Sequence, residues 1–174
     1  MAKFNKLYIM VGVPGSGKST WIDKHKAAFK TPYKIVSRDK IRFSLVSEDE
    51  PYFSKEDEVF KVFIKEIKDG LANGLDVYAD ATHLSGFSRG KLLRALGPSI
   101  KDTKIEAIVI KTSLNTAIAQ NNLREGRSFV PKSVVRRMYT QLEEPTLEEG
   151  FDKIWIYQNE NNNENRYIVY QKED

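Results

Sequence analysis

The sequence has no cysteine among its 174 residues, so disulfide bonds, thiolate metal sites and a cysteine nucleophile are excluded. It also lacks an apolar run long enough to span a bilayer, and no signal-peptide pattern follows Met1. We therefore expect a protein of the reducing cytoplasm with no membrane anchor. The excess of basic residues is small. The 28 Lys and Arg against 24 Asp and Glu give a net charge of +4, which is compatible with an anionic partner but does not identify one.

What the sequence does contain is a regular alternation of apolar runs with helix-period segments, without an internal repeat. We expect strands over residues 6–11, 33–37, 75–79, 104–111 and 152–157. We expect helices over residues 18–29, 39–46, 55–73, 86–96, 114–125 and 131–144. A polar turn over 159–165 and an alternating run over 166–171 predict a C-terminal β-hairpin over about 152–172. The order predicts a three-layer α/β fold with a mostly parallel five-stranded sheet, in one domain over residues 1–174.

A glycine-rich segment, Gly-Val-Pro-Gly-Ser-Gly-Lys-Ser over residues 12–19, follows the first predicted strand and precedes the first predicted helix. Glycines let a loop wrap its N–H groups around phosphate oxygens, and the following helix adds the positive end of its dipole. We expect Lys18 to reach the β- and γ-phosphates and the Ser19 hydroxyl to bind Mg²⁺. The flanking strand and helix disfavour a chance match. The predicted nucleoside-triphosphate site is Gly12, Pro14, Gly15, Ser16, Gly17, Lys18, Ser19 and Thr20.

The segment over residues 37–42 lies where the second predicted strand ends and a helix begins. In an open parallel sheet, this end of a strand borders the ligand crevice. Phosphoryl transfer to a hydroxyl needs a carboxylate that takes the hydroxyl proton and cations that orient an anionic acceptor. Asp39 and Arg42, three residues apart, can face one pocket in those two roles. Alternatively, Asp39 is only the N-cap of the helix. The nearby phosphate loop favours the first interpretation.

The third predicted strand leads into Asp80, and Thr82 and His83 follow it. Asp80 is placed to hold a Mg²⁺-bound water near Ser19, although strands also commonly end in aspartate as a turn residue. Thr82 and His83 then lie at the mouth of the crevice. There, His83 either contacts a substrate or is a surface turn residue. The segment therefore predicts a second acidic residue for the metal site and two candidates for binding the acceptor.

Basic residues gather around Gly126, between the fifth and sixth predicted helices. A glycine-containing break flanked by arginines is typical of a mobile lid that closes over a triphosphate. The forked donors of arginine suit the charge that spreads over a transferring phosphoryl group. We expect a lid over about residues 124–131, with Arg124 and Arg127 as its catalytic arginines. The remaining cations fit the solvated face of a helix at least as well: Lys132, Arg136 and Arg137.

These motifs together resemble the phage-type 5'-hydroxyl polynucleotide kinase domain, a P-loop kinase. The resemblance is carried by residues 12–21, 37–42, 80–84, 124–131 and 137–139. It implies Mg²⁺-dependent transfer of the γ-phosphate of ATP to the 5'-OH of DNA or RNA, with nucleic acid 5' ends as partners. It makes Asp39 the general base, Arg42 a contact of the acceptor's 3'-phosphate, and Arg124 and Arg127 clamps on the donor phosphates. The acceptor-binding set that we expect is Arg38, Asp39, Arg42, Thr82 and His83.

The chain departs from that family's pattern in two places. His83 stands where the family commonly has asparagine, and the spacing of the lid arginines differs. Residues 138–145 also resemble the helix that follows the lid in kinases that act on aminoacyl-tRNA. Two alternatives therefore stay open, because fold and loop are widely shared. One is a kinase of a small metabolite, a nucleoside or a tRNA-attached acceptor, and the other is a non-catalytic nucleotide binder.

Overall fold

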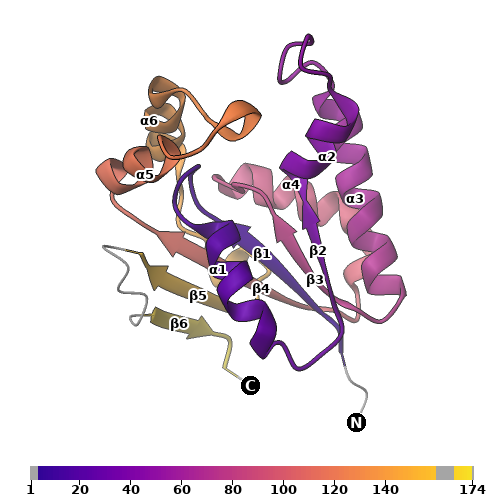
Figure 1. The fold of residues 1–174 in the computed structure, drawn as a ribbon. Coiled ribbons are helices and arrows are strands. Elements are labelled where there is room, and N and C mark those ends of the chain that lie inside the picture. The colour runs from indigo at the N-terminus through magenta and orange to yellow at the C-terminus, as the bar shows by residue number, and fades with distance from the viewer. Residues whose placement is uncertain (1–3, 160–166, 174) are drawn as a thin grey trace.

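The computed structural model describes residues 4–159 and 167–173 as a sheet with helices on both faces (Figure 1). The strands lie in the order β2-β3-β1-β4-β5-β6. Neighbours from β2 to β5 are parallel, and β6 runs antiparallel to β5 at the edge of the sheet. The strands are β1 (Lys6–Val11), β2 (Tyr33–Ser37), β3 (Asp76–Asp80), β4 (Lys104–Lys111), β5 (Lys153–Gln158) and β6 (Tyr167–Gln171).

Helices connect the parallel strands, as parallel pairing requires. The α-helices are α1 (Lys18–His25), α2 (Arg38–Leu45), α3 (Glu56–Ala72), α4 (Gly86–Leu96), α5 (Leu114–Asn121) and α6 (Lys132–Gln141). Four short 3₁₀ turns complete the described elements: η1 (Lys26–Ala28), η2 (Gly97–Ile100), η3 (Gly126–Ser128) and η4 (Leu147–Glu149). Within the described residues, no helix is both long and apolar enough to cross a membrane.

The larger hydrophobic core lies between one face of the sheet and helices α3 and α4. Ile9 of β1, Phe63 of α3 and Leu92 of α4 are buried in it. Helices α3 and α4 pack on the sheet because the burial of each such apolar side chain stabilises the fold by about 1.5–3 kcal/mol. The core fixes the carboxyl ends of β1, β2 and β3 side by side, and these ends carry the candidate site.

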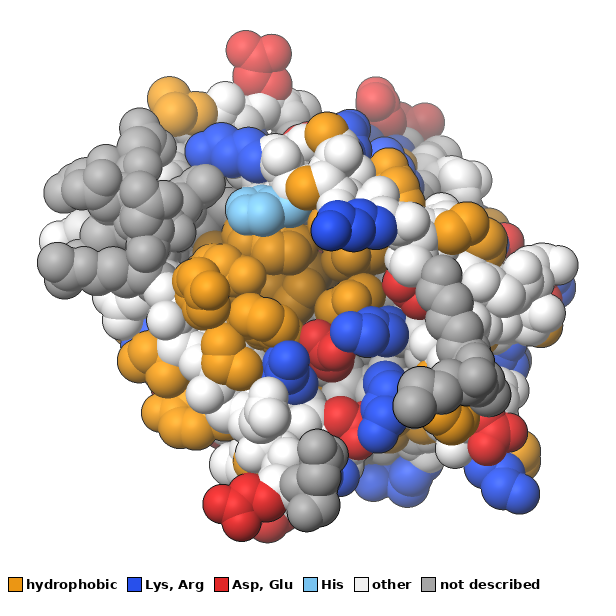
Figure 2. All heavy atoms as spheres, turned by 90° about the horizontal axis from the view of Figure 1, so that it is seen from below, with side chains coloured by type: hydrophobic (Ala, Val, Ile, Leu, Met, Phe, Trp, Pro, Cys, Tyr) orange, Lys and Arg blue, Asp and Glu red, His pale blue; other side chains and the backbone are white. Residues whose placement is uncertain are grey.

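The opposite face of the sheet is covered by α1 over part of its width. Trp21 and Ile22 of α1 pack on a second buried cluster, against which several aromatic side chains are only partly buried, among them Tyr8 and Trp155. Viewed from below, hydrophobic side chains gather in a hollow bordered by Lys and Arg (Figure 2). The phosphate loop lies at the end of this layer, because α1 begins directly after it.

The mostly parallel α/β fold and the C-terminal hairpin are confirmed. Residues 160–165 of the predicted hairpin turn lie outside the described residues. The first helix is shorter than predicted, because the chain turns inward after η1 and the Phe29 ring stacks on Tyr78 with centroids 4.4 Å apart. The fifth helix was predicted to reach Glu125 but ends at Asn121. There, the buried Asn121 side chain donates to Val130 O at 2.6 Å and accepts from Val130 N at 3.1 Å, which closes the loop between them.

Candidate functional site

The loop between β1 and α1 has the conformation of a phosphate cradle. Gly15 and Gly17 have φ angles of 79° and 100°, which side chains other than glycine rarely adopt. A Cβ at Gly15 would also overlap the carbonyl oxygen of Ala117, so the loop needs glycine there for space as well. The Ser16 hydroxyl is buried and finds no partner among the described residues. A buried polar group of this kind at a helix N-terminus fits an anion such as a phosphate.

Lys18 lies inside this cradle. Its ammonium donates to Gly12 O at 2.8 Å and Val13 O at 3.0 Å. Burial lowers the pKa of Lys18 to about 8, while the nearby Asp80 and Asp39 carboxylates act in the opposite direction. The ammonium is therefore held at the loop at a large cost in hydration. A bound phosphate would offset that cost.

Ser19 and Asp80, the two residues predicted for the magnesium site, lie within hydrogen-bond distance of each other. The Ser19 hydroxyl donates to Asp80 Oδ2 at 3.1 Å, and this bond joins the first turn of α1 to the end of β3. Burial raises the pKa of Asp80, whereas Lys18 and the Ser19 bond lower it. Hydroxyl and carboxylate oxygens suit Mg²⁺, which keeps several waters and takes further oxygens from nucleotide phosphates. The residues present therefore fit a nucleotide-bound magnesium ion.

Asp39 lies in the first turn of α2, with its side chain 60% exposed. The N-cap of this helix is Ser37, whose hydroxyl accepts from Lys40 N at 3.3 Å, so the interpretation of Asp39 as the cap is wrong. Asp39 Oδ1 accepts from Arg42 Nη1 at 2.6 Å and from the Tyr52 hydroxyl at 3.2 Å. Both hydrogen bonds are accepted by Oδ1, and neither involves Oδ2. The carboxylate is thus oriented by two neighbours and remains open to solvent.

Arg42 is buried, and its guanidinium is bound on several sides. Its Nε and Nη2 donate to the two carboxylate oxygens of Glu56 at 2.7 and 3.1 Å. Arg38 donates to the same carboxylate at 3.1 Å. The structure therefore places Arg42 where it orients Asp39 and pairs with Glu56, and not as a free cation. Neither Tyr52 nor Glu56 was predicted as a site residue: Tyr52 lies in the segment between α2 and α3, and Glu56 is the first residue of α3.

Thr82 and His83 lie against the strand that leads into the phosphate loop. Gly12 N donates to Thr82 O at 3.0 Å, and His83 Nδ1 lies 2.6 Å from Met10 O. His83 is only 6% exposed, so its interpretation as a surface turn residue is wrong. Its φ of 45° is left-handed, which is uncommon outside glycine. Burial lowers the pKa of His83 to about 4, so the imidazole is neutral at pH 7.

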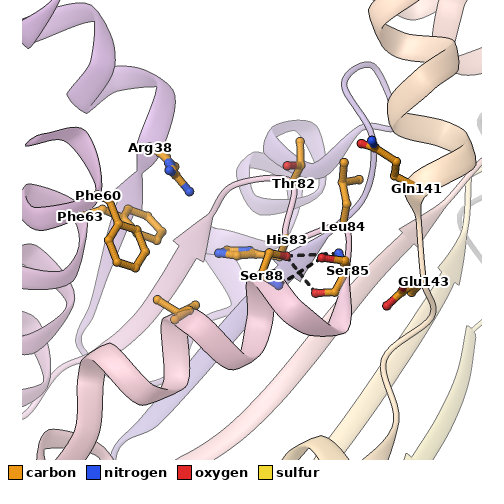
Figure 3. A pocket seen from close by; sticks show the side chains of 11 residues that line it. Arg38, Phe60, Phe63, Thr82, His83, Leu84, Ser85, Ser88, Gln141 and Glu143 are labelled. Carbon is orange, nitrogen blue, oxygen red and sulfur yellow. Dashed lines mark hydrogen bonds between the residues drawn. The ribbon is translucent and has the colours of Figure 1, made fainter. Parts of the chain in front are cut away.

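A pocket of about 460 Å³ opens beside this loop (Figure 3). Helices α3 and α4 and the loop after β3 form its walls, and the segment after α6 closes one side. Its lining residues are Arg38, Phe60, Phe63, Thr82, His83, Leu84, Ser85, Ser88, Leu92, Gln141 and Glu143. The pocket thus contains three of the five residues predicted to bind an acceptor. We refer to it as the His83 pocket.

Arg89 of α4 holds the backbone of two residues that line the His83 pocket. It is buried, and its guanidinium donates to His83 O at 2.9 Å and to Glu143 O at 3.0 Å. It also pairs with both carboxylate oxygens of Glu149 at 2.7 and 3.1 Å. One side chain therefore fixes the loop after β3 to the segment after α6. This role of Arg89 could not be predicted from the sequence, because two of its partners lie 54 and 60 residues further along the chain.

Arg124 and Arg127, the two arginines of the predicted lid, have different surroundings. Arg124 lines a second pocket of about 340 Å³ beside the phosphate loop, together with Gly15, Gly17, Thr20, Lys24, Gln120, Leu123 and Asn159. The charge of Arg124 also contributes to the lowered pKa of Lys18, after burial as the main cause. Arg127 instead donates to the carbonyl oxygens of Phe43 and Val46 at the end of α2. Three further cations are exposed on α6, as a solvated helix face would have them: Lys132, Arg136 and Arg137.

Comparisons with known proteins identify the family to which most of this chain belongs. The AAA_33 family, described as an AAA domain, matches residues 7–145. The transcription factor bHLH140 of Arabidopsis thaliana is 23% identical over 172 residues, a match that covers 94% of this chain and 17% of that protein. A chain in the structure of the Pnkp1/Rnl/Hen1 RNA repair complex is 27% identical with a TM-score of 0.61. That match covers 82% of this chain and 45% of the other, so this chain spans less than half the length of either protein.

A sugar kinase from Janibacter sp. is 18% identical with a TM-score of 0.63, and the match covers 88% of this chain and 85% of that one. At this identity the likeness shows the fold alone. The match to the family model includes the phosphate loop, Asp39 and Asp80, and it spans most of the chain. The chain therefore belongs to the AAA_33 family and has the α/β fold of a P-loop kinase, with the nucleotide-binding loop that this fold carries.

Proposed function

We propose that this protein is a Mg²⁺-dependent kinase that transfers the γ-phosphate of ATP to the 5'-hydroxyl of a polynucleotide. One observation carries the proposal: an exposed, oriented carboxylate stands beside a phosphate loop. Ser37 pairs with Asp80 across β2 and β3, so Asp39 begins α2 next to the strand end whose carboxylate binds Ser19. The charge of Asp39 also contributes to the pKa of both Lys18 and Asp80, although burial has the larger effect on each.

The proposed reaction follows from these positions. Asp39 accepts the proton of the acceptor hydroxyl as its oxygen attacks the γ-phosphorus and the bond to the β-phosphate oxygen breaks, releasing ADP. Lys18 and the N–H groups of the loop stabilise the charge on the phosphates. Ser19 and Asp80 would hold Mg²⁺ at this site, where the ion would supply neutralisation of the phosphate charge. Arg124 faces the same region and is the lid arginine that we propose to contact the donor.

Two lines of support favour a polynucleotide acceptor. The spacing of the phosphate loop, the segment 37–42, the segment 80–84 and the lid resembles that of 5'-hydroxyl polynucleotide kinases. The chain is also 27% identical to part of a protein in an RNA repair complex. A kinase of a small alcohol is the alternative, and it is supported by the fold of the sugar kinase alone.

The test is transfer of labelled γ-phosphate from ATP to a panel of acceptors. The panel contains 5'-OH DNA, 5'-OH RNA, nucleosides and small sugars, each with Mg²⁺ or with excess chelator. We expect label on a 5'-OH oligonucleotide, dependence on the divalent cation, and loss of transfer in Lys18→Ala. Label found only on sugars would replace the polynucleotide with a small alcohol. Undiminished transfer in Lys18→Ala would contradict the assignment of the phosphate loop.

A further inference from the structure

The His83 pocket contains two buried polar atoms that lack a partner. Four buried side-chain atoms find no hydrogen bond among the described residues: Ser16 Oγ, Trp21 Nε1, Arg38 Nε and His83 Nε2. Ser16 belongs to the phosphate cradle, and Arg38 and His83 both line the His83 pocket. Buried polar groups are nearly always paired in native proteins, so two unpaired atoms in one pocket point to a ligand.

The chemistry of the two atoms is defined by their neighbours. Met10 O can only accept, so His83 Nδ1 must carry the hydrogen in their 2.6 Å contact. The neutral ring then presents a lone pair at Nε2, which can only accept a hydrogen bond. Arg38 Nε can only donate. A ligand that satisfies both atoms offers one N–H or O–H donor and one acceptor.

The pocket also discriminates by charge. The positive charge of Arg38 is already paired with Glu56 at 3.1 Å. The Glu143 carboxylate lines the pocket and accepts from Gly86 N at 2.8 Å, and the walls opposite His83 include the Phe60 and Phe63 rings (Figure 3). A carboxylate or phosphate placed here would meet the exposed Glu143 carboxylate and the aromatic walls, while the Arg38 guanidinium is already paired with Glu56. The pocket is therefore suited to a neutral ring.

We propose that the His83 pocket binds the sugar–base part of the acceptor's 5'-terminal nucleotide, with His83 Nε2 accepting from it and Arg38 Nε donating to it. This proposal rests on the proposed function. A nucleoside is a neutral ring system with donors and acceptors along its edge, whereas a sugar acid or a sugar phosphate carries the charge that the pocket disfavours. Asp39 follows Arg38 in the chain, so a nucleoside held here lies beside the proposed base. His83 is thus a residue that determines acceptor specificity.

The test compares 5'-OH oligonucleotides that differ only in a natural or an abasic 5'-terminal nucleotide. For the wild-type protein, we expect the abasic end to raise KM by about tenfold, the effect of one or two lost hydrogen bonds. His83→Ala should raise KM for the natural end by a similar factor and leave KM for the abasic end and for ATP almost unchanged. His25→Ala, which removes the other histidine from α1, should change none of these values.

His83→Asn serves as the conservative variant, because asparagine tolerates a positive φ and its amide retains a donor and an acceptor. We expect it to recover part of the discrimination that His83→Ala loses. Equal KM values for the two ends in the wild type, with both phosphorylated, would overturn this inference and leave the kinase proposal intact. Failure to phosphorylate any 5'-OH oligonucleotide, with label on a sugar acid, would overturn both.

Discussion

Ser19 and Asp80 are joined by a hydrogen bond of 3.1 Å from Oγ to Oδ2, although 61 residues separate them in the chain. The bond exists because β1 and β3 are adjacent parallel strands, so that α1 begins beside the end of β3. A hydroxyl and a carboxylate oxygen, the types of ligand that Mg²⁺ prefers, are thereby held side by side.

Asp80→Asn should weaken the use of Mg²⁺ without unfolding the protein. The amide keeps the size of the side chain but removes the negative charge, so we expect the Mg²⁺ concentration for half-maximal transfer to rise by about tenfold or more. The measurement is a Mg²⁺ titration of phosphoryl transfer at saturating ATP. Asp23→Asn, at an exposed position on α1, is the matched control and should behave as wild type. Identical titrations for the two variants would contradict the role of Asp80.

The buried ammonium of Lys18 predicts that ATP binding weakens at high pH. Burial lowers the pKa of Lys18 in the free protein to about 8, and a bound triphosphate favours the charged form. Above pH 8, binding must therefore include the uptake of a proton. We expect Kd for ATP to be about tenfold higher at pH 9 than at pH 7. Calorimetric titration at both pH values checks this, and Lys18→Met should bind weakly with no such pH dependence.

Tyr52→Phe should slow phosphoryl transfer while ATP binding stays unchanged. The Tyr52 hydroxyl donates one of the two hydrogen bonds that orient Asp39 Oδ1. Loss of a bond worth about 1 kcal/mol corresponds to a decrease in kcat of about fivefold. Single-turnover transfer rates and Kd for ATP are measured in parallel, with Tyr170→Phe on the exposed strand β6 as the control. If kcat is unchanged, Arg42 alone orients the carboxylate.

Arg89→Leu should lower the free energy of unfolding by about 3 kcal/mol. The substitution leaves Glu149 and the carbonyl oxygens of His83 and Glu143 without the guanidinium that they share. Urea denaturation measures the loss. Arg94→Ala on the same helix removes an exposed arginine and should cost less than about 0.5 kcal/mol. Similar losses for the two variants would show that the Arg89 network contributes little to stability.

The fold could be predicted largely from the sequence because its strands are short apolar runs with clear ends. The limits of β1, β2 and β4 match the predicted ones, since each run is bounded by polar or turn residues. Helix ends were less predictable because tertiary contacts set them. Helix α5 ends at Asn121, whose side chain binds the backbone of Val130. After η1 the chain turns inward, and the Phe29 ring stacks on Tyr78.

In the candidate site, too, the parts encoded by a local segment could be predicted, whereas the parts set by tertiary contacts could not. The phosphate loop is a contiguous segment, so its conformation could be predicted from local spacing. Asp80 could be placed near Ser19 because it ends an apolar strand, where phosphate-loop enzymes have their second acidic motif. Tyr52 and Glu56 could not be found, because their bonds to Asp39 and Arg42 depend on how the loop before α3 folds back on α2. The burial of His83 was also hidden, because a polar residue after a strand is typical of an exposed turn.

The most direct test of the account is the behaviour of Asp39→Asn with a 5'-OH oligonucleotide and ATP. The amide cannot take the acceptor proton, but it leaves the phosphate loop untouched. We predict that Kd for ATP stays within about threefold of wild type, while the rate of transfer falls by about 10²–10⁴-fold. A variant that transfers phosphate at the wild-type rate would contradict the role of Asp39 as the base. A parallel loss of ATP binding and transfer would show instead that Asp39 holds the site together.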